Sequence, residues 1–264
     1  MDKFILSYNG NKYIESKKYL KNIIEDNKDI QILAEPFCGI FGFSRCFYYL
    51  NDNKDILYWL NDINNDLITF YKKLKIDFEG AINEVENELN KYDKNFDMTN
   101  DKNKSYILNC ICRNHNERFC NIDKGKTKIK NFRSKKIEYM CFLEKCEFFN
   151  MDCNDFLKLI PIEKKALIYF DPPYFNSNNK MYCDNFKEGE DYHDGTYIYL
   201  NILESFKNKN NNHKKLFVLN KIDIINYLFK EFYYLEYSGS YCNTIVNKIN
   251  NTKKNVKKHI IYYD

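Results

Sequence analysis

The sequence predicts a doubly wound α/β fold with a separate insert, and two observations support this prediction. Short apolar runs with the composition of buried strands alternate with segments whose apolar residues recur at helical spacing. Between residues 75 and 147 the strand signals stop, and a highly charged, helix-like stretch takes their place. We therefore expect a sheet-containing domain over 1–74 and 148–264, interrupted by a small, mainly helical domain over 75–147.

The first part of the sheet domain has the pattern helix, strand, loop, helix, strand, helix. Apolar residues recur at helical spacing in 12–25, whereas 29–34 (DIQILA) is a short apolar run that favours a buried strand. The elements that we expect are a helix over 12–25, a strand over 29–34, a helix over 45–50, a strand over 56–60 and a helix over 67–74.

The strand signals resume after the insert. The run Ala166–Phe170 (ALIYF) is continuously apolar, which is typical of a strand buried on both faces. Further strands are expected over 146–151, 215–219 and 259–263, and the clearest helix of the insert is expected over 81–92.

Composition excludes several classes of protein. The chain has 264 residues, a net charge of +4 and 44% hydrophobic residues, too many for a wholly disordered chain. No apolar run approaches the roughly 18 residues of a membrane span, and the N-terminus lacks a signal-peptide pattern. We expect a cytoplasmic protein, without a membrane partner, whose ten cysteines are reduced.

Cysteine spacing and residue bias carry less information. Cys110, Cys112, His115 and Cys120 lie close together, but no C-x-x-C pair is present and the spacing fits no standard zinc pattern, so no metal is expected. Lys, Asn, Ile and Tyr are abundant whereas Ala, Gly and Pro are scarce. This bias is typical of an AT-rich genome, and a bacterium, a virus or a mobile element is the expected source.

The segment Asp171-Pro172-Pro173-Tyr174 follows the apolar run Ala166–Phe170 directly. A strand end places Asp171 at the carboxyl edge of a parallel sheet, where α/β folds bind ligands. The prolines fix the loop, and their carbonyls remain available as acceptors. Asp171 and the Pro172 carbonyl would accept the hydrogens of an exocyclic amino group while Tyr174 stacks on the base, which favours attack of the nitrogen on an electrophilic methyl group. The alternative is a strand-terminating turn.

Five segments, in this order along the chain, resemble motifs of the Dam-type DNA adenine-N6 methyltransferases. Ser7–Lys12 (SYNGNK) is similar to the W-A-G-G-K segment of that family, and Glu35–Gly39 (EPFCG) to its E-P-F-x-G segment. The other three are Asn61–Leu67 (NDINNDL, family D-I-N-x-D-L), Cys153–Phe156 (CNDF, family G-D-F) and Asp171–Tyr174 (family D-P-P-Y).

The resemblance implies a Rossmann-like class I methyltransferase sheet with helices on both faces. It also implies site-specific methyl transfer from S-adenosyl-L-methionine to N6 of a flipped-out adenine in duplex DNA. Asp171, Pro172, Pro173 and Tyr174 would be catalytic. The cofactor would contact Tyr8, Lys12, Glu35, Phe37, Gly39, Asp62, Ile63, Asp155, Phe156 and Asp171.

The residues themselves agree with part of this assignment. Gly39 lets backbone approach a ligand closely, and Asp62 follows it at the spacing of about 20 residues at which an acidic side chain binds ribose. The alternatives are a helix N-cap for Asp62, a surface lysine for Lys12 and a core aromatic for Phe156.

Three positions depart from the family pattern. Phe41 stands at the second glycine of the family's G-x-G, with Gly42 after it, and Tyr8 and Asn11 replace the family's Trp and second Gly. A phenylalanine at position 41 is expected to crowd the backbone beside the methionine moiety, which predicts a loop shifted by one residue or weakened binding.

The insert resembles the target-recognition segment of the same family. Asn109 and Arg118 lie in the stretches that carry this resemblance. Because arginine is scarce in this chain, Arg113, Arg118 and Arg133 are the expected base or phosphate contacts. Lys124, Lys126 and Arg133 belong to a basic cluster that favours DNA phosphates, and a solvated lysine face is the alternative.

Double-stranded DNA is the expected partner, and a cognate restriction nuclease is compatible with the resemblance. Two other functions stay open from the sequence. One is methylation of cytosine N4 or of adenine in RNA, and the other is a non-catalytic DNA-binding protein with the same fold.

Overall fold

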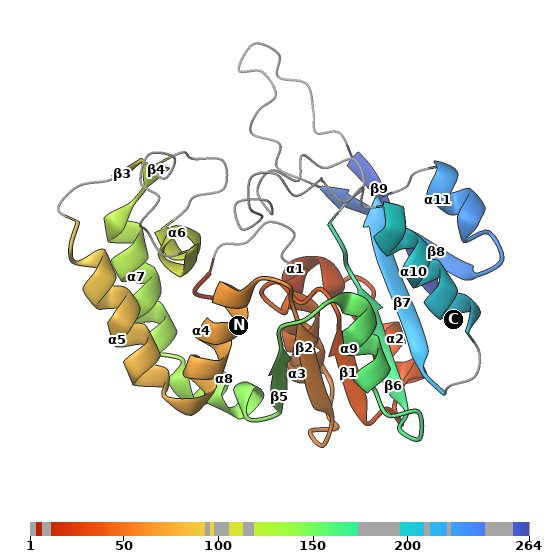
Figure 1. The fold of residues 1–264 in the computed structure, drawn as a ribbon, viewed down its shortest axis with the longest axis horizontal. Helices are drawn as coiled ribbons and strands as arrows, with labels where there is room; N and C mark the ends of the chain where they lie inside the picture. The colour runs from red at the N-terminus through yellow and green to blue at the C-terminus, as the bar shows by residue number, and fades with distance from the viewer. Residues whose placement is uncertain are drawn as a thin grey trace, which may run out of the picture. The chain divides into compact units, whose positions relative to one another are not determined.

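Figure 1 shows the chain as a computed structural model, which describes residues 4–6, 12–92, 96–97, 106–112, 119–173, 196–208, 212–220, 223–240 and 256–263. The chain divides into two compact units. The first contains Met1–Lys28 and Cys38–Met151, and the second contains Asp29–Phe37 and Asp152–Asp264. Both units combine helices with parallel strands, so the prediction of an α/β fold is confirmed.

Strands of the second unit, in the residues that the structure describes, follow the order β1-β6-β7-β9-β8. Strands β1, β6 and β7 are parallel, whereas β9 is antiparallel to both β7 and β8. Every residue of β6 is buried, as its continuous apolar sequence predicts. The bounds are β1 Ile32–Glu35, β6 Ala166–Phe170, β7 Lys214–Asn220, β8 Tyr233–Ser240 and β9 Val256–Tyr263.

In its described residues this unit has three helices, namely α9 Cys153–Leu159, α10 Thr196–Lys207 and α11 Asp223–Leu228. Helix α10 packs on the sheet through aromatic rings, since Tyr199 contacts Phe217 of β7 and Phe206 contacts Phe170 of β6. The ring centroids lie 5.7 Å and 6.3 Å apart in these two pairs. Figure 1 shows α10 running alongside β7, and a hydrogen bond from Tyr199 to the Pro173 carbonyl places this helix beside the residues directly after β6.

The first unit has two parallel strands, β2 Leu57–Asn61 and β5 Cys146–Phe149, and a larger set of helices. The helices are α1 Tyr13–Ser16, α2 Leu20–Asp26, α3 Gly42–Leu50, α4 Asn65–Ile76, α5 Phe78–Leu89, α6 Tyr106–Cys112, α7 Ile122–Arg133 and α8 Lys136–Leu143. Between α5 and α7 lies a short antiparallel pair, β3 Phe96–Asp97 with β4 Phe119–Cys120.

Side-chain caps explain where three of these helices begin. Asn64 caps α4, Asp77 caps α5 and Asn121 caps α7, each accepting a hydrogen bond from a backbone N–H of the first turn. Helix α7 also lies close to its neighbours at Gly125, where a Cβ would come within 2.8 Å of Cys112 Sγ. The glycine therefore permits an approach between α7 and α6 that a side chain would prevent.

Aromatic rings form the core of the first unit. Phe4 makes edge contacts with Phe41 and Phe132, at centroid distances of 4.8 Å and 5.3 Å, and Tyr139 packs on the same cluster. The guanidinium of Arg45 is fully buried over the rings of Tyr13 and Phe4. Burial lowers the pKa of Arg45 from its ordinary value, and the ring faces partly compensate for its lost hydration.

Two expectations from the sequence need correction. The single helix over 12–25 is wrong, because α1 ends at Ser16 and α2 begins at Leu20. The buried positions of the two short helices do not continue one helical repeat, so Ile14 is 64% exposed whereas Leu20 is buried. The first strand covers Ile32–Glu35 instead of 29–34.

Candidate active site

The loop Cys38–Phe41, called the Gly39 loop below, contains two residues in the left-handed region. Gly39 has a φ of 47° and Phe41 a φ of 42°. Backbone hydrogen bonds fix both ends of the turn, since the Cys38 N–H donates to the Asn61 carbonyl at 2.8 Å and the Phe41 N–H donates to the Cys38 carbonyl at 2.5 Å. Helix α3 begins directly afterwards, at Gly42.

Asp62 follows β2 and contacts the Gly39 loop. Its Oδ2 accepts a hydrogen bond from the Gly39 N–H at 2.9 Å, and its Oδ1 accepts one from the Asn64 N–H at 2.9 Å. Burial raises the pKa of Asp62, and the two hydrogen bonds oppose that shift. The side chain that caps α4 is Asn64, so the alternative of a helix cap does not describe Asp62. The structure thus brings together two of the expected cofactor residues, Gly39 and Asp62.

Tyr71 of α4 completes this arrangement, and sequence reasoning missed it. Its hydroxyl donates to the Gly39 carbonyl at 2.7 Å, and its ring lies 4.7 Å from that of Phe41. In the sequence Tyr71 appears only as one apolar position among those of the helix expected over 67–74. The spacing marks a buried face, but nothing in it indicates which backbone group the hydroxyl reaches.

Phe41 occupies the position at which the family has glycine, and its ring turns into the core. The ring is fully buried, with centroids of Phe4, Tyr71, Phe142 and Phe148 between 4.7 Å and 6.2 Å away. A left-handed non-glycine residue costs about 1–2 kcal/mol, and burial of a phenylalanine side chain contributes about 1.5–3 kcal/mol. The aromatic cluster therefore offsets the backbone strain at Phe41.

The segment Asp171–Pro173, called the Asp171 loop below, begins where β6 ends. Pro172 is buried, whereas Asp171 and Pro173 are half-buried. The Tyr199 hydroxyl donates to the Pro173 carbonyl at 3.0 Å. Glu35 is buried at the carboxyl end of β1, which is parallel to β6, so Glu35 and Asp171 lie at the same edge of the sheet. Tyr174 lies outside the described residues.

Helix α9 carries the other pair of acidic and aromatic residues expected at the cofactor. Asp155 is exposed and forms an ion pair with Lys158 at 2.8 Å, while Phe156 is fully buried, which favours the interpretation as a core aromatic. Asp152 has the more organised contacts. It caps α9 by accepting from the Asn154 N–H at 2.7 Å, and it accepts from the Tyr197 hydroxyl at 3.0 Å. Asp152 directly precedes the CNDF segment and is not among the residues that the sequence motifs single out.

The remaining expected cofactor residues differ in exposure. Lys12 is buried and pairs with Glu15 at 3.2 Å, so it is not one of the many surface lysines. Phe37 is half-buried, and Ile63, next to Asp62, is 63% exposed. Tyr8 falls outside the part of the chain that the structure describes.

Two of the expected DNA contacts lie on the exposed side of α7. Lys124 and Lys126 are both exposed, whereas the intervening Gly125 is buried. Asn109 belongs to α6, and Arg113 and Arg118 lie outside the described residues. The structure thus presents Lys124 and Lys126 to solvent from one helix.

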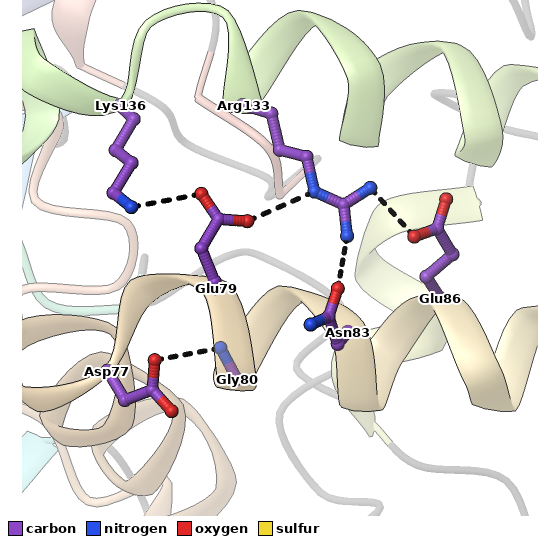
Figure 2. Close-up of polar contacts among 7 residues, drawn as sticks. All are labelled: Asp77, Glu79, Gly80, Asn83, Glu86, Arg133 and Lys136. Atoms are coloured by element: carbon purple, nitrogen blue, oxygen red, sulfur yellow. Dashed lines mark hydrogen bonds and ion pairs between the residues drawn. The ribbon is translucent and has the colours of Figure 1, made fainter.

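Arg133, at the end of α7, has contacts of a different kind (Figure 2). Its guanidinium pairs with Glu86 at 2.7 Å and with Glu79 at 3.4 Å, and it donates to Asn83 at 2.5 Å. Lys136 also pairs with Glu79, at 3.1 Å. These partly exposed contacts link α7 and the start of α8 to α5, so a DNA contact by Arg133 would have to compete with them.

Two kinds of feature are absent from the described ranges. No helix within them is long and apolar enough to cross a membrane. No three His, Cys, Asp or Glu side chains within them gather in a way that would hold a metal ion.

Similarities to known proteins were found both among solved structures and among sequences. Two solved methyltransferase structures are similar to this chain at low identity. They are precorrin-6y C5,15-methyltransferase from Geobacter metallireducens GS-15 (7% identical, TM-score 0.43, covering 100% of this chain and 96% of that one) and the delta-N METTL16 MTase domain (9% identical, TM-score 0.46, covering 97% and 83%).

The chain is also 26% identical over 210 residues to the retron Ec67 DNA adenine methylase of Escherichia coli, covering 72% of this chain and 70% of that protein. The model of one family, the D12 class N6 adenine-specific DNA methyltransferases, matches residues 8–242. Because this match spans most of the sequence, the chain belongs to the D12 class of N6 adenine-specific DNA methyltransferases.

Proposed function

We propose that this enzyme uses S-adenosyl-L-methionine to methylate N6 of an adenine flipped out of duplex DNA. Membership of the family gives the reaction class. The observation that carries the assignment of the active residues is the Asp171 loop, where a carboxylate and two prolines follow the buried parallel strand β6. A base inside a duplex is inaccessible to such a loop, which is why the adenine must leave the stack.

The Asp171 loop suits an amine that is a poor nucleophile. The adenine amino group delocalises its lone pair into the ring, and acceptors for its two hydrogens favour a tetrahedral nitrogen. Asp171 supplies a carboxylate and Pro172 a carbonyl, whereas the Pro173 carbonyl already accepts from Tyr199. S-adenosylmethionine, when bound, supplies an electrophilic methyl group. The Asp171 carboxylate would stabilise the positive charge that the nitrogen acquires as it takes the methyl group, and it would accept the proton that the nitrogen then loses.

Asp62, Ile63 and Gly39 have the chemistry that a nucleoside cofactor requires. The Asp62 carboxylate has about four acceptor sites and uses two of them for backbone N–H groups, so acceptors remain for ribose hydroxyls. The exposed apolar side chain of Ile63 suits one face of an adenine ring. Gly39, without a Cβ, permits close approach of a ligand to the backbone. These features support the assignment of this loop to the cofactor.

The insert over 75–147 is proposed to recognise the DNA target. Lys124 and Lys126, exposed on α7, suit the phosphate backbone, which supplies much of the affinity of DNA-binding proteins. Arg133 supports the same surface indirectly, by linking α7 to α5. Tyr174 is proposed to stack on the flipped base.

The experiment that tests this function uses the full chain, duplex DNA free of adenine methylation and S-adenosylmethionine. The DNA is digested to nucleosides, which mass spectrometry identifies. We expect N6-methyladenine from the unmodified enzyme, and a rate at least about 100-fold lower from Asp171→Asn, which removes a charge that stabilises the transition state.

Asp29→Asn is the matched control for Asp171→Asn. Asp29 is an exposed carboxylate of the same unit and pairs with Lys165 before β1 begins, so this variant should retain the unmodified rate. Detection of N4-methylcytosine, or transfer to RNA alone, would replace the proposed substrate. Absence of transfer to any nucleic acid despite cofactor binding would favour a non-catalytic protein.

A further inference from the structure

We infer that Tyr71 is a positioning residue that holds the Gly39 loop in the shape required for binding S-adenosylmethionine. The inference rests on the proposed function of this loop, and it concerns a residue that contacts the loop from outside it. Tyr71 lies in the middle of α4, nine residues after Asp62 along the same chain segment.

The peptide groups of Gly39 are held from both sides. Its N–H donates to Asp62 at 2.9 Å, and its carbonyl accepts from the Tyr71 hydroxyl at 2.7 Å. The Cys38 thiol lies 3.7 Å from the same carbonyl, but a thiol is a weak donor. Tyr71 is therefore the strong donor to the Gly39 carbonyl in the part of the chain that the structure describes.

The ring of Tyr71 contacts the second left-handed residue of the loop. It packs edge-on against Phe41, with centroids 4.7 Å apart, and it also contacts Phe148 at 5.5 Å. The hydroxyl acts at Gly39 and the ring at Phe41, so one side chain contacts both positions at which the backbone is left-handed. Burial raises the pKa of Tyr71 far above its ordinary value, which keeps the hydroxyl protonated as a donor.

These contacts make the loop ready before a ligand arrives. Glycine has access to more backbone conformations than any other residue, so without the Tyr71 hydroxyl the Gly39 peptide would populate other orientations. The apparent dissociation constant rises in inverse proportion to the fraction of molecules in the competent conformation. The chemistry of transfer, once the ligand is bound, does not involve Tyr71.

The test is Tyr71→Phe, which deletes the hydroxyl and keeps the ring contacts. Titration calorimetry with S-adenosylmethionine, in the absence of DNA, should give a Kd about tenfold higher than that of the unmodified enzyme. At saturating S-adenosylmethionine, kcat should stay within about twofold. If Tyr71 acted only on stability, Tyr71→Phe would lower the thermal midpoint of unfolding, and the Kd would not rise while kcat stays constant.

Tyr58→Phe is the matched control. Tyr58 is another buried tyrosine of the same unit, and within the described residues its hydroxyl makes no hydrogen bond. Removal of that hydroxyl should leave the Kd for S-adenosylmethionine unchanged. An equal rise of the Kd in both variants would overturn the inference, because it would show that loss of a buried tyrosine hydroxyl anywhere in this unit weakens binding.

The outcomes separate this inference from the proposed function. If the unmodified enzyme does not bind S-adenosylmethionine, the proposed function fails. If it binds, and Tyr71→Phe binds equally well, only the positioning role fails. Should Tyr71→Phe not fold, amide exchange of the unmodified enzyme still decides. The inference requires Gly39 and Phe41 amides to be protected before ligand is added, and rapid exchange that slows only with ligand would contradict it.

Discussion

The Gly39 loop and the Asp171 loop both follow a buried strand, yet their backbones are fixed by different means. The Gly39 loop contains the most flexible residue type, and partners at Asn61, Asp62 and Tyr71 hold it from outside. The Asp171 loop contains two prolines, whose rings restrict φ covalently. The Tyr199 hydroxyl of α10 donates a hydrogen bond to its Pro173 carbonyl.

This difference determines where each loop is sensitive to mutation. A loop that is held by partners loses its shape when a distant side chain changes, even though its own sequence is intact. A loop restricted by proline keeps most of its shape and depends on outside groups only for fine orientation. Variants outside the Gly39 loop should therefore affect folding or ligand affinity, and variants outside the Asp171 loop should affect the rate of transfer.

The largest expected effect is at Phe41. Phe41→Ala removes a ring from the aromatic core and leaves the strained backbone, so the free energy of unfolding should fall by about 3–5 kcal/mol. Phe41→Gly loses the same ring but relieves a left-handed strain of about 1–2 kcal/mol. The glycine variant should therefore be the more stable of the two in urea denaturation.

Phe43 provides the control for that order. It is fully buried in α3, where an ordinary helical backbone makes glycine about 1 kcal/mol less stable than alanine. The pair Phe43→Ala and Phe43→Gly should show alanine as the more stable variant. If both positions gave the same order, the strain assigned to Phe41 would be absent in solution.

A smaller effect is expected at Tyr199. Tyr199→Phe removes the hydrogen bond to Pro173, so the acceptors of the Asp171 loop are less well oriented and kcat should fall about tenfold. The Kd for S-adenosylmethionine should not change, in contrast to Tyr71→Phe. Single-turnover transfer at saturating cofactor, combined with calorimetry, measures both quantities.

Tyr197→Phe is suited as the control for Tyr199→Phe. Tyr197 lies on the same helix, is 41% exposed, and donates a hydrogen bond of the same 3.0 Å length to Asp152. At saturating cofactor its kcat should stay within about twofold of the unmodified value. A tenfold fall in both variants would assign the effect to α10 as a whole.

The smallest expected effect is electrostatic and concerns Asp62, which contacts the Gly39 loop. Burial raises the pKa of Asp62 above its ordinary 3.8, so the folded chain holds this proton more tightly than the unfolded chain does. The stability from that proton is present below pH 3.8 and is lost as the pH rises through the folded pKa.

The comparison of the unmodified protein with Asp62→Asn isolates this contribution, since asparagine does not titrate. The other carboxylates are the same in both proteins, so their contributions cancel in the difference between the two free energies of unfolding. The free energy of unfolding of the unmodified protein minus that of Asp62→Asn should become smaller as the pH rises from about 4 towards neutrality. Urea denaturation at a series of pH values measures it. A difference that grows with pH would mean that the hydrogen bonds to Asp62 outweigh its burial.

Elements with a strong local signal could be predicted from the sequence, and those that depend on tertiary contacts could not. Ala166–Phe170 was predicted to the residue because a strand buried on both faces is apolar throughout. The break between α1 and α2 is not evident from the sequence, because α1 buries Tyr13 in place of the more apolar Ile14. The buried positions of the two helices therefore do not follow one continuous helical repeat. Which side of each helix is buried depends on the elements that it packs against.

The same limit applies to the site. Gly39 and Asp62 could be selected by their spacing, and the structure joins them by a hydrogen bond. Tyr71 and Tyr199 could not be selected, because their function depends on a hydroxyl that reaches a backbone carbonyl far away along the chain. In a sequence this rich in tyrosine, the residue type alone carries no such information.

The order of segments in the second unit has a consequence for synthesis of the protein on the ribosome. Gln31, which directly precedes β1, bonds with Lys165, which directly precedes β6, and the two residues are 134 positions apart. At about 5–20 residues per second, β1 leaves the ribosome roughly 7–27 seconds before β6 does. During this interval the nascent chain exposes a strand edge that its partner β6 does not yet cover, whereas α5, α7 and α8 are already available to each other. Slower translation between the two strands would lengthen the period in which β1 is open to wrong pairing or to a chaperone.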